Sequence, residues 1–243
     1  MQNTVNLVLN AKKFPRRPGI YLFKNTQDDV LYVGKALSLR DRVLSYFVKD
    51  ASTKQKNLVD ESSTIDYIET GSEFEALILE AKYIKLYRPR YNIVLKDGKS
   101  FLYIFISIGE KFPRIFTTRK PTLPDAADLT EYENKRGVFF GPFPSSSGVR
   151  NVLKLIRRIF PYCQQKRLSN PCFYSHIGLC SPCPSYIVTQ SPDRKKDLTR
   201  QYRWQLFSIK HLLEGKLAYV TDELKRKMKL YSKKELFEDA VQV

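Results

Sequence analysis

The sequence predicts a small α+β domain at its N-terminal end, and three observations support this fold class. Two short β-prone runs, 19–23 and 30–33, flank a polar turn, which is the pattern of an antiparallel hairpin. A helical segment follows from about residue 38, and a third β-prone run covers 64–70. A second helical segment begins after Ser72. We therefore expect an antiparallel sheet flanked by helices.

Local signals place the ends of these helices. Ser38 is a suitable N-cap for a helix that runs to about Phe47, and a polar helix is expected over 54–60. Ser72 and Glu75 have the capping-box spacing that opens the later helix. Pro89 is expected to end that helix, because proline disfavours the helical conformation of the residue before it.

The rest of the chain divides by composition. We expect a first domain over 1–97 and a β-containing linker region over 98–161. A cysteine-rich segment follows over 162–190, and a helical tail covers 191–243. Within the linker region, the expected elements are strands near 101–108, 114–118 and 137–140, a loop over 121–134 and a basic amphipathic helix over 149–159.

The chain is strongly basic. Its 243 residues contain 42 Lys and Arg against 25 Asp and Glu, a formal net charge of +17. An excess of this size predicts an anionic partner, and nucleic acid is the foremost class. The two histidines, His176 and His211, are too few for a multi-histidine metal site, and no phosphate-binding glycine loop occurs.

The chain carries no evident signal for membrane insertion or export. Its longest apolar stretch, 101–108, is too short to cross a bilayer. The N-terminal residues lack the basic start and apolar centre of a signal peptide. We expect a cytoplasmic protein without membrane contact, acting as a monomer.

The first domain collects side chains suited to phosphodiester chemistry. Tyr21 and Tyr32 lie on the two strands of the hairpin, each near a glycine. Arg42 and Tyr46 share one face of the following helix. Glu80 lies among apolar residues of the later helix, where a carboxylate needs a cation. Glu80-Ala81-Lys82 also matches the E-x-K motif of restriction-type nucleases. That motif lies on a strand, where residues i and i+2 share a face, whereas the capping box places these residues on a helix.

Taken together, these residues resemble the GIY-YIG nucleases. The signature is Gly19-Ile20-Tyr21 followed by Tyr32-Val33-Gly34. The wording is closest to the N-terminal half of the UvrC family, with Arg17-Pro18-Gly19-Ile20-Tyr21 and Leu31-Tyr32-Val33-Gly34-Lys35-Ala36. Further matches are Leu39-Arg40-Asp41-Arg42, Tyr87-Arg88-Pro89-Arg90-Tyr91-Asn92 and Phe139-Phe140-Gly141-Pro142-Phe143.

The resemblance implies hydrolysis of a DNA phosphodiester with one Mg²⁺ or Mn²⁺ ion, which Glu80 would ligate. Tyr32 would help to deprotonate the attacking water, and Lys35 would favour its phenolate. Arg42 would hold the phosphate. Tyr21, Tyr46 and Asn92 would orient the water, the phosphate and the metal-side network.

Four cysteines cluster within 21 residues. Cys163, Cys172, Cys180 and Cys183 have the spacing C-x8-C-x7-C-x2-C, which indicates thiolate-bound metal. Either a tetrahedral zinc ion or an iron–sulfur cluster would suit four thiolates. The resemblance to the UvrC family favours a [4Fe-4S] cluster, although the last gap is one residue shorter than usual in that family.

Basic residues recur along the chain beside aromatic ones and predict contacts with DNA phosphates. The tail resembles the start of the helical hairpin through which UvrC-family members bind UvrB, with UvrA engaged indirectly. The expected DNA-contact residues are Arg40, Arg88, Arg90, Lys154, Arg157 and Arg158.

The resemblance implies the 3′ incision of damaged double-stranded DNA in nucleotide excision repair. The tail pattern ends at Val243 before it is complete, so the chain is expected to be either a fragment or a short stand-alone nuclease like the UvrC homologue Cho. Two other readings remain open at this stage. One is a non-catalytic scaffold that binds DNA and UvrB, and the other is a different GIY-YIG nuclease activity.

Overall fold

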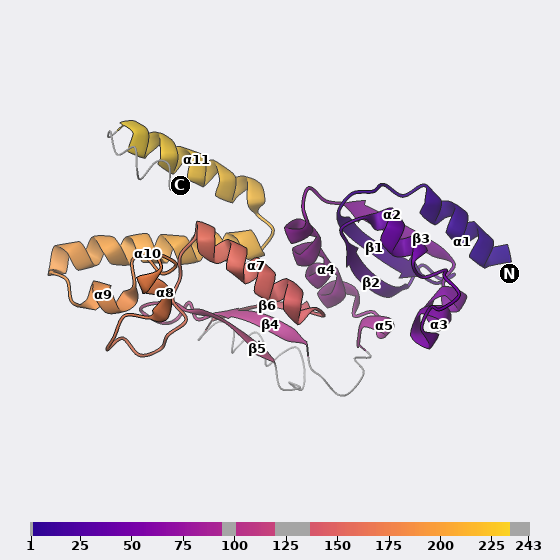
Figure 1. Ribbon diagram of the computed structural model, residues 1–243, viewed down its shortest axis with the longest axis horizontal. Coiled ribbons are helices and arrows are strands. Elements are labelled where there is room, and N and C mark those ends of the chain that lie inside the picture. Colours follow the sequence, from indigo (N-terminus) through magenta and orange to yellow (C-terminus); the bar gives the residue numbers. More distant parts are fainter. Residues whose placement is uncertain (1, 94–100, 120–136, 234–243) are drawn as a thin grey trace. The chain divides into compact units, whose positions relative to one another are not determined.

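The computed structural model describes residues 2–93, 101–119 and 137–233, and it confirms the predicted α+β class (Figure 1). The chain forms two compact units, Met1–Leu102 with Gly141–Ser146, and Tyr103–Phe140 with Ser147–Val243. The finer division into four segments stays a prediction. In chain order the elements are α1 (Gln2–Lys12), β1 (Gly19–Lys24), β2 (Val30–Ala36), α2 (Leu39–Leu44), α3 (Thr53–Glu61), β3 (Thr64–Glu69), α4 (Glu73–Tyr87), α5 (Arg90–Ile93), β4 (Leu102–Ile106), β5 (Ile115–Arg119), β6 (Val138–Phe143), α7 (Ser146–Ile159), α8 (Phe173–His176), α9 (Pro184–Val188), α10 (Pro192–Leu213) and α11 (Leu217–Lys233).

The first sheet has the strand order β2-β1-β3, and both pairings are antiparallel. The predicted hairpin is therefore confirmed. Tyr21 on the central strand lies opposite Gly34 on β2 and opposite Tyr67 on β3. Because β1 is central, its residues are held from both sides by backbone hydrogen bonds.

Strand β1 is buried on both faces of this sheet. Tyr21 and Phe23 point into a cluster built with α1, α2 and α3. Ile20 and Leu22 alternate with them and pack on the opposite side against α4 (Figure 1). The single strand Gly19–Lys24 thus ties the helices of both layers to one sheet.

Two glycines permit close packing around this strand. A Cβ atom on Gly34 would lie 2.5 Å from the hydroxyl oxygen of Tyr21 and 2.6 Å from its Cζ. A Cβ atom on Gly19 would lie 2.3 Å from the carbonyl oxygen of Ile68. Both positions therefore require glycine for steric reasons, and neither has an unusual backbone angle.

The predicted start of α4 is confirmed, with one difference. The Ser72 hydroxyl accepts a hydrogen bond from the Glu75 N–H at 3.1 Å, but the Glu75 carboxylate accepts from the N–H of Gly71. The helix ends at Tyr87, where Arg88 adopts a left-handed conformation with φ of 45° just before Pro89. The chain thus turns sharply at the position that the proline predicts.

Other helices differ from the prediction. Ser38 precedes α2, but its hydroxyl donates to the Asp41 carboxylate and the helix ends at Leu44. Helix α1 was not predicted, because its start has no capping residue of the usual kind. A complete capping box between Ser52 and Gln55 opens α3 and was also overlooked.

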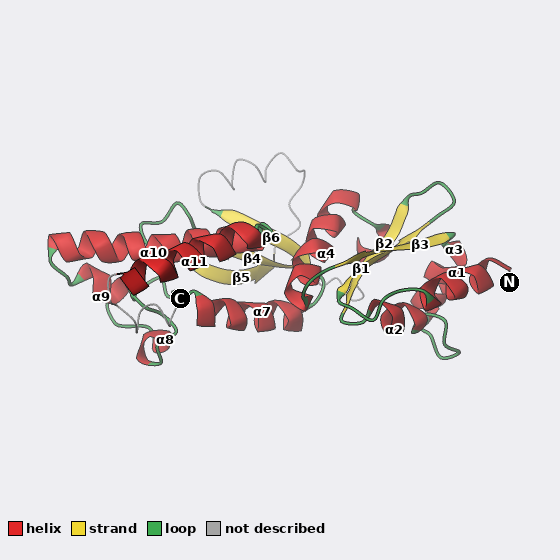
Figure 2. Cartoon of the chain, turned by 90° about the horizontal axis from the view of Figure 1, so that it is seen from above, coloured by secondary structure: helices red, strands yellow, loops and turns green. Residues whose placement is uncertain are grey.

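The second sheet has the order β5-β4-β6, and helix α7 lies along it (Figure 2). The strands and the helix were predicted within a few residues. Helix α7 buries its apolar side through Val149, Val152, Leu153 and Ile156. The predicted loop over 121–134 and the last part of the tail lie outside the described residues.

Helices α10 and α11 form the described part of the tail. They are joined at Gly215, which has a φ of 80°. Across the described ranges, every helix is either too short or too polar to span a bilayer.

The double burial of β1 predicts a large effect of truncation there. Phe23 is fully buried, so Phe23→Ala is expected to lower the free energy of unfolding by about 3–5 kcal/mol. Urea denaturation measures this value. Leu37→Ala removes an exposed side chain and should change stability by no more than about 0.5 kcal/mol. Equal effects of the two substitutions would contradict the packing described for β1.

Candidate active site and metal centre

Three tyrosines, from β1, β2 and the turn that follows α2, meet on one face of the first sheet. The Tyr21 and Tyr46 hydroxyls are 2.8 Å apart and hydrogen-bonded, in a buried position. The Tyr32 ring centroid lies 6.0 Å from that of Tyr21 and 6.3 Å from that of Tyr46. The structure therefore brings together residues that are separated by up to 25 positions in the sequence.

Arg42 lies at the solvent side of this cluster. Its Nε donates to the Tyr21 hydroxyl at 3.3 Å, and its guanidinium lies 5.7 Å from the Tyr46 ring centroid. Among the described residues, no carboxylate pairs with it. The remaining N–H groups of Arg42 are thus available to an external anion.

Burial dominates the protonation of the tyrosines. It raises the pKa of Tyr21, Tyr32 and Tyr46 above the ordinary value. The positive charge of Arg42 acts in the opposite direction on the pKa of Tyr21 and Tyr32. Without a further positive charge, the three tyrosines are neutral at physiological pH.

Glu80 is a buried carboxylate that is only half satisfied. It is 4% exposed, and its Oε1 accepts a hydrogen bond from the Lys35 backbone N–H at 3.0 Å. Its Oε2 is buried with no hydrogen-bond partner in the described part of the chain. Burial raises the pKa of Glu80 to about 7, and the Lys35 N–H moderates this rise. A buried oxygen without a partner is where a cation would fit.

Lys35 affects the pKa of Glu80 more directly than that of Tyr32. Its Nζ donates to the Glu73 carboxylate at 2.8 Å, and its charge lowers the pKa of Glu80. The charge that lowers the pKa of Tyr32 comes from Arg42. The structure thus gives Lys35 a position on the carboxylate side of the site. Sequence reasoning had not identified Glu73, because an exposed glutamate at a helix start has no distinguishing pattern.

Asn92 is fully engaged with the backbone of β2. Its Oδ1 accepts from the Val33 N–H, and its Nδ2 donates to the Val33 carbonyl, both at 2.8 Å. The side chain is 6% exposed. Asn92 therefore anchors α5 to the strand between Tyr32 and Gly34, and so positions the site.

The basic residues predicted to contact DNA differ in availability. Arg88 and Arg90 are exposed, but Arg90 is paired with Glu61 and lies over the Tyr91 ring. Arg40 is partly buried on α2. On the exposed side of α7, Arg150, Lys154 and Arg158 follow one another at intervals of four residues.

Arg157 does not belong to that exposed stripe. It is 5% exposed, and its guanidinium lies 3.8 Å from the Tyr162 ring centroid and 3.7 Å from that of Tyr174. A guanidinium enclosed between two rings cannot reach a phosphate. We therefore do not retain Arg157 among the DNA-contact residues. The sequence indicates this burial, because Arg157 follows the buried Leu153 by four residues and therefore lies on the same face of α7.

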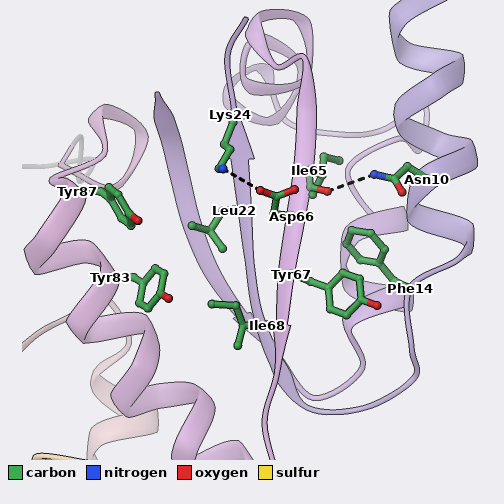
Figure 3. Close-up of a pocket in the computed structure, with 10 residues that line it drawn as sticks. All are labelled: Asn10, Phe14, Leu22, Lys24, Ile65, Asp66, Tyr67, Ile68, Tyr83 and Tyr87. Carbon is green, nitrogen blue, oxygen red and sulfur yellow. Dashed lines mark hydrogen bonds and ion pairs between the residues drawn. The ribbon is translucent and has the colours of Figure 1, made fainter. Parts of the chain in front are cut away.

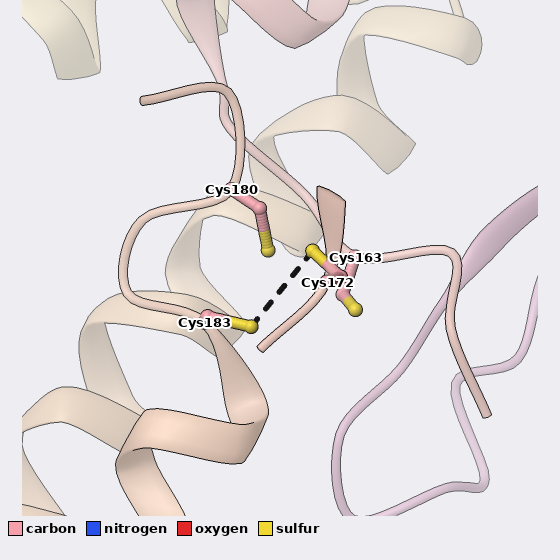
Figure 4. A group of neighbouring side chains, drawn as sticks. All are labelled: Cys163, Cys172, Cys180 and Cys183. Carbon is pink, nitrogen blue, oxygen red and sulfur yellow. Dashed lines mark hydrogen bonds between the residues drawn. The ribbon is translucent and has the colours of Figure 1, made fainter. Parts of the chain in front are cut away.

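The four cysteines gather at one place in the second unit (Figure 4). All four are buried, and their sulfur atoms lie within 4.8 Å of one another. Cys172 and Cys183 precede the short helices α8 and α9, and the sulfurs of these two residues are 3.9 Å apart. Four sulfurs at such distances can surround a metal.

The pKa values of the four thiols are shifted in different directions, lower for Cys163 and Cys183 and higher for Cys172 and Cys180. The hydrogen bond between Cys180 and Cys163 lowers the pKa of Cys163 to about 6 and raises that of Cys180. The Cys183 sulfur lies 3.0 Å from the Ser185 hydroxyl, and its pKa is lowered as well. A set of four buried thiols without carboxylates suits zinc or iron–sulfur ligation.

A separate pocket of about 460 Å³ borders the edge strand β3 (Figure 3). Asn10 and Phe14 line one side, Tyr83 and Tyr87 line the other, and an ion pair between Lys24 and Asp66 lies between them. None of the candidate catalytic residues lines this pocket. We therefore assign it no part in the site.

Comparison with known protein families matches two consecutive regions. A UvrC-like GIY-YIG domain model matches residues 17–93, and a model of the UvrC/Cho excinuclease middle domain matches residues 101–191. The chain contains the GIY-YIG and middle domains of the UvrC family. The first match includes all the candidate residues of the tyrosine cluster together with Glu80 and Asn92, and the second includes the four cysteines.

Curated relatives are similar over nearly the whole chain. The UvrABC system protein C of Desulforudis audaxviator is 40% identical over 238 residues, which cover 96% of this chain and 35% of the relative. That of Clostridium tetani is 41% identical over 239 residues, which cover 94% of this chain and 35% of the relative. The UvrC-like chain thus spans about a third of the length of these relatives.

A magnesium-bound structure of the GIY-YIG N-terminal endonuclease domain of UvrC from Thermotoga maritima is also similar. It is 36% identical with a TM-score of 0.34, and the match covers 35% of this chain and 94% of that one.

The half-satisfied Glu80 predicts a pH-dependent stability in metal-free protein. A pKa raised from 4.5 to about 7 favours the folded state fully below pH 4.5, and this contribution is lost as the pH rises through 7. The loss amounts to about 3 kcal/mol. Urea unfolding in EDTA should therefore show wild type losing stability relative to Glu80→Gln between these pH values. Mg²⁺ should restore stability at pH 8 in wild type only.

Parallel pH profiles for wild type and Glu80→Gln would contradict this prediction. Glu69→Gln serves as the control, because the Glu69 carboxylate is exposed and paired with Arg17. That variant should follow the wild-type profile.

Proposed function

We propose that this chain is a metal-dependent DNA endonuclease that makes the 3′ nick beside a lesion in nucleotide excision repair. The observation that carries the proposal is the partnerless Oε2 of Glu80 near the cluster of Tyr21, Tyr32, Tyr46 and Arg42. The relatives are named as the C protein of the UvrABC system, and we extend that activity to this chain.

Glu80 is the residue that would hold the catalytic cation, Mg²⁺ or Mn²⁺. A hard cation accepts a single carboxylate and completes its coordination with water molecules. Such an ion, when bound, neutralises charge on the phosphate and lowers the pKa of a bound water. The Lys35 N–H fixes Oε1 of Glu80, so that Oε2 is the oxygen left for the ion.

Arg42 would bind the scissile phosphate. Its Nε is held by the Tyr21 hydroxyl, which fixes the plane of the guanidinium. The outward N–H groups can then donate to phosphate oxygens and stabilise the negative charge that develops in the transition state. The bond between the Tyr21 and Tyr46 hydroxyls keeps this arrangement rigid.

In its phenolate form, which a cation held by Glu80 would help to stabilise, Tyr32 would accept the proton of the attacking water. Its phenolate is disfavoured by burial, and the charge of Arg42 offsets part of that penalty. Tyr21 and Tyr46 would orient the water and the phosphate through their hydroxyls. Asn92 would support these groups indirectly by holding the backbone of Val33.

The substrate and partners follow from the same family relation. We infer that damaged double-stranded DNA is the substrate and that UvrB, with UvrA engaged indirectly, positions the chain at the lesion. The protein would act as a monomer in the cytoplasm. The four buried cysteines would hold a metal centre, a [4Fe-4S] cluster or a zinc ion, which stabilises the second unit.

The exposed stripe of α7 would supply part of the DNA-binding surface. Arg150, Lys154 and Arg158 present three positive charges along one side of a helix. Such contacts go to phosphates and carry no base specificity. This suits an enzyme that is directed by partners rather than by sequence.

Nicking of a lesion-containing duplex with UvrA, UvrB and Mg²⁺ tests the proposed activity. Wild type should cut once on the 3′ side of the lesion. Arg42→Ala should lower the rate by about 100-fold or more, because a donor to the transition state is lost. Glu80→Gln should abolish metal-dependent cutting, and Glu69→Gln should leave the rate unchanged.

Tight DNA binding without any nick under these conditions would overturn the catalytic proposal and favour a binding scaffold. A nick that needs neither UvrA nor UvrB would favour a stand-alone nuclease.

Salt titration of DNA binding tests the α7 stripe. Lys154→Ala and Arg158→Ala should each weaken binding similarly on any sequence and reduce the slope of log K against log salt by about 1. Fluorescence anisotropy with a labelled duplex measures both quantities. Glu223→Gln, a change in a carboxylate on α11 paired with Arg226, is the control. An unchanged slope in both α7 variants would remove the stripe from the DNA-binding surface.

A further inference from the structure

Arg157 is a buried cation without a carboxylate partner. It is 5% exposed, and across the described residues no acidic side chain forms an ion pair with it. In the described part of the chain, the groups that contact its guanidinium are neutral. They are the rings of Tyr162 and Tyr174, whose centroids lie 3.8 Å and 3.7 Å from the guanidinium carbon, and the Tyr162 carbonyl, which accepts from Nη1 at 2.6 Å.

Such an environment is costly for a charged group. Removing a guanidinium from water is unfavourable unless a negative charge compensates it. Two aromatic faces offset only part of the desolvation. The position therefore points to an anion close by that the protein side chains themselves do not provide as a carboxylate.

Both tyrosines lie close in sequence to cysteines of the cluster. Tyr162 immediately precedes Cys163, and Tyr174 follows Cys172 by two residues. The guanidinium thus joins the two segments that carry the first two cysteines. Four thiolates around a divalent ion, or around an iron–sulfur cluster, carry a net negative charge, and a cation held by the neighbouring tyrosines would balance part of it.

We propose that Arg157 is the positioning residue of the four-cysteine metal centre. Stacked between Tyr162 and Tyr174, it fixes the segments of Cys163 and Cys172 and supplies the positive charge that balances the metal–thiolate group. This inference rests on the proposed metal centre. It assigns to Arg157 a role unlike that of its neighbour Arg158, which is exposed to solvent.

Arginine is specifically suited to this role. Its guanidinium is planar, stays charged when buried and can stack on two rings while donating hydrogen bonds in its own plane. Lysine keeps the charge but has no flat faces. Lysine at this position should therefore retain part of the effect, and an uncharged residue should lose it.

Metal retention by the full chain tests the proposal. Zinc and iron in the purified wild type are measured by elemental analysis, and the rate of metal release to a chelator is followed. Arg157→Gln should release metal about 10–100-fold faster, the range typical of lost outer contacts to a metal centre. Arg157→Lys should be intermediate. Arg158→Gln, the matched control on the same helix, should release metal at the wild-type rate.

A purely structural role is separated by unfolding with and without metal. If Arg157 acts through the centre, Arg157→Gln should destabilise the metal-loaded protein more than the metal-stripped protein. Equal destabilisation of both forms would overturn the proposal. If Arg157→Gln does not fold, Arg157→Lys decides, and release at the wild-type rate by that variant overturns it.

Metal content and metal release together distinguish the absence of a metal centre from the absence of a role for Arg157. A wild type that contains neither zinc nor iron would remove the metal centre, and the role of Arg157 with it. A wild type that holds metal, together with an Arg157→Gln variant that releases it equally slowly, would remove only the role of Arg157.

Discussion

The burial of strand β1 on both faces is the constraint from which the geometry of the first unit follows. One face turns Tyr21 toward α2, where its hydroxyl meets Tyr46 and Arg42. The other face packs on α4, which brings Glu80 to the backbone N–H of Lys35 on β2. Because β2 is an edge strand, its outer backbone groups are free to be bound by side chains. A single central strand thereby sets both halves of the site.

Local chemistry explains why much of this was predictable from the sequence. The hairpin depends on alternating apolar runs around a polar turn, and the start of α4 depends on the Ser72 hydroxyl reaching Glu75 N–H three residues later. The prediction of the cysteine cluster depends only on the sequence spacing of the four cysteines. The same Glu80 was singled out because a carboxylate among apolar helix residues is costly, and its burial follows from that helix.

Features that depend on tertiary contacts were not predictable in the same way. Lys35 and Glu73 are 38 residues apart, and no pattern in the sequence pairs them. Arg157 and Arg158 are chemically identical neighbours, and only the phase of α7 separates a buried guanidinium from an exposed one. A list of basic residues therefore overestimates a DNA-binding surface until the helix face of each residue is known.

Unused bonding capacity distinguishes a supporting polar residue from one that is prepared for a ligand. Asn92 is as buried as Glu80, yet each end of its amide has a hydrogen bond to Val33, so neither polar atom is left without a partner. One carboxylate oxygen of Glu80 accepts a hydrogen bond from the backbone, and the other has no partner in the described part of the chain. Arg157 presents the same contrast with opposite charge, since its hydrogen bond and its two rings leave its positive charge unbalanced. Among the described residues, Oε1 of Gln205 is also buried without a hydrogen-bond partner, but it belongs to a neutral amide. At the charged groups, we expect a bound ion to complete the structure.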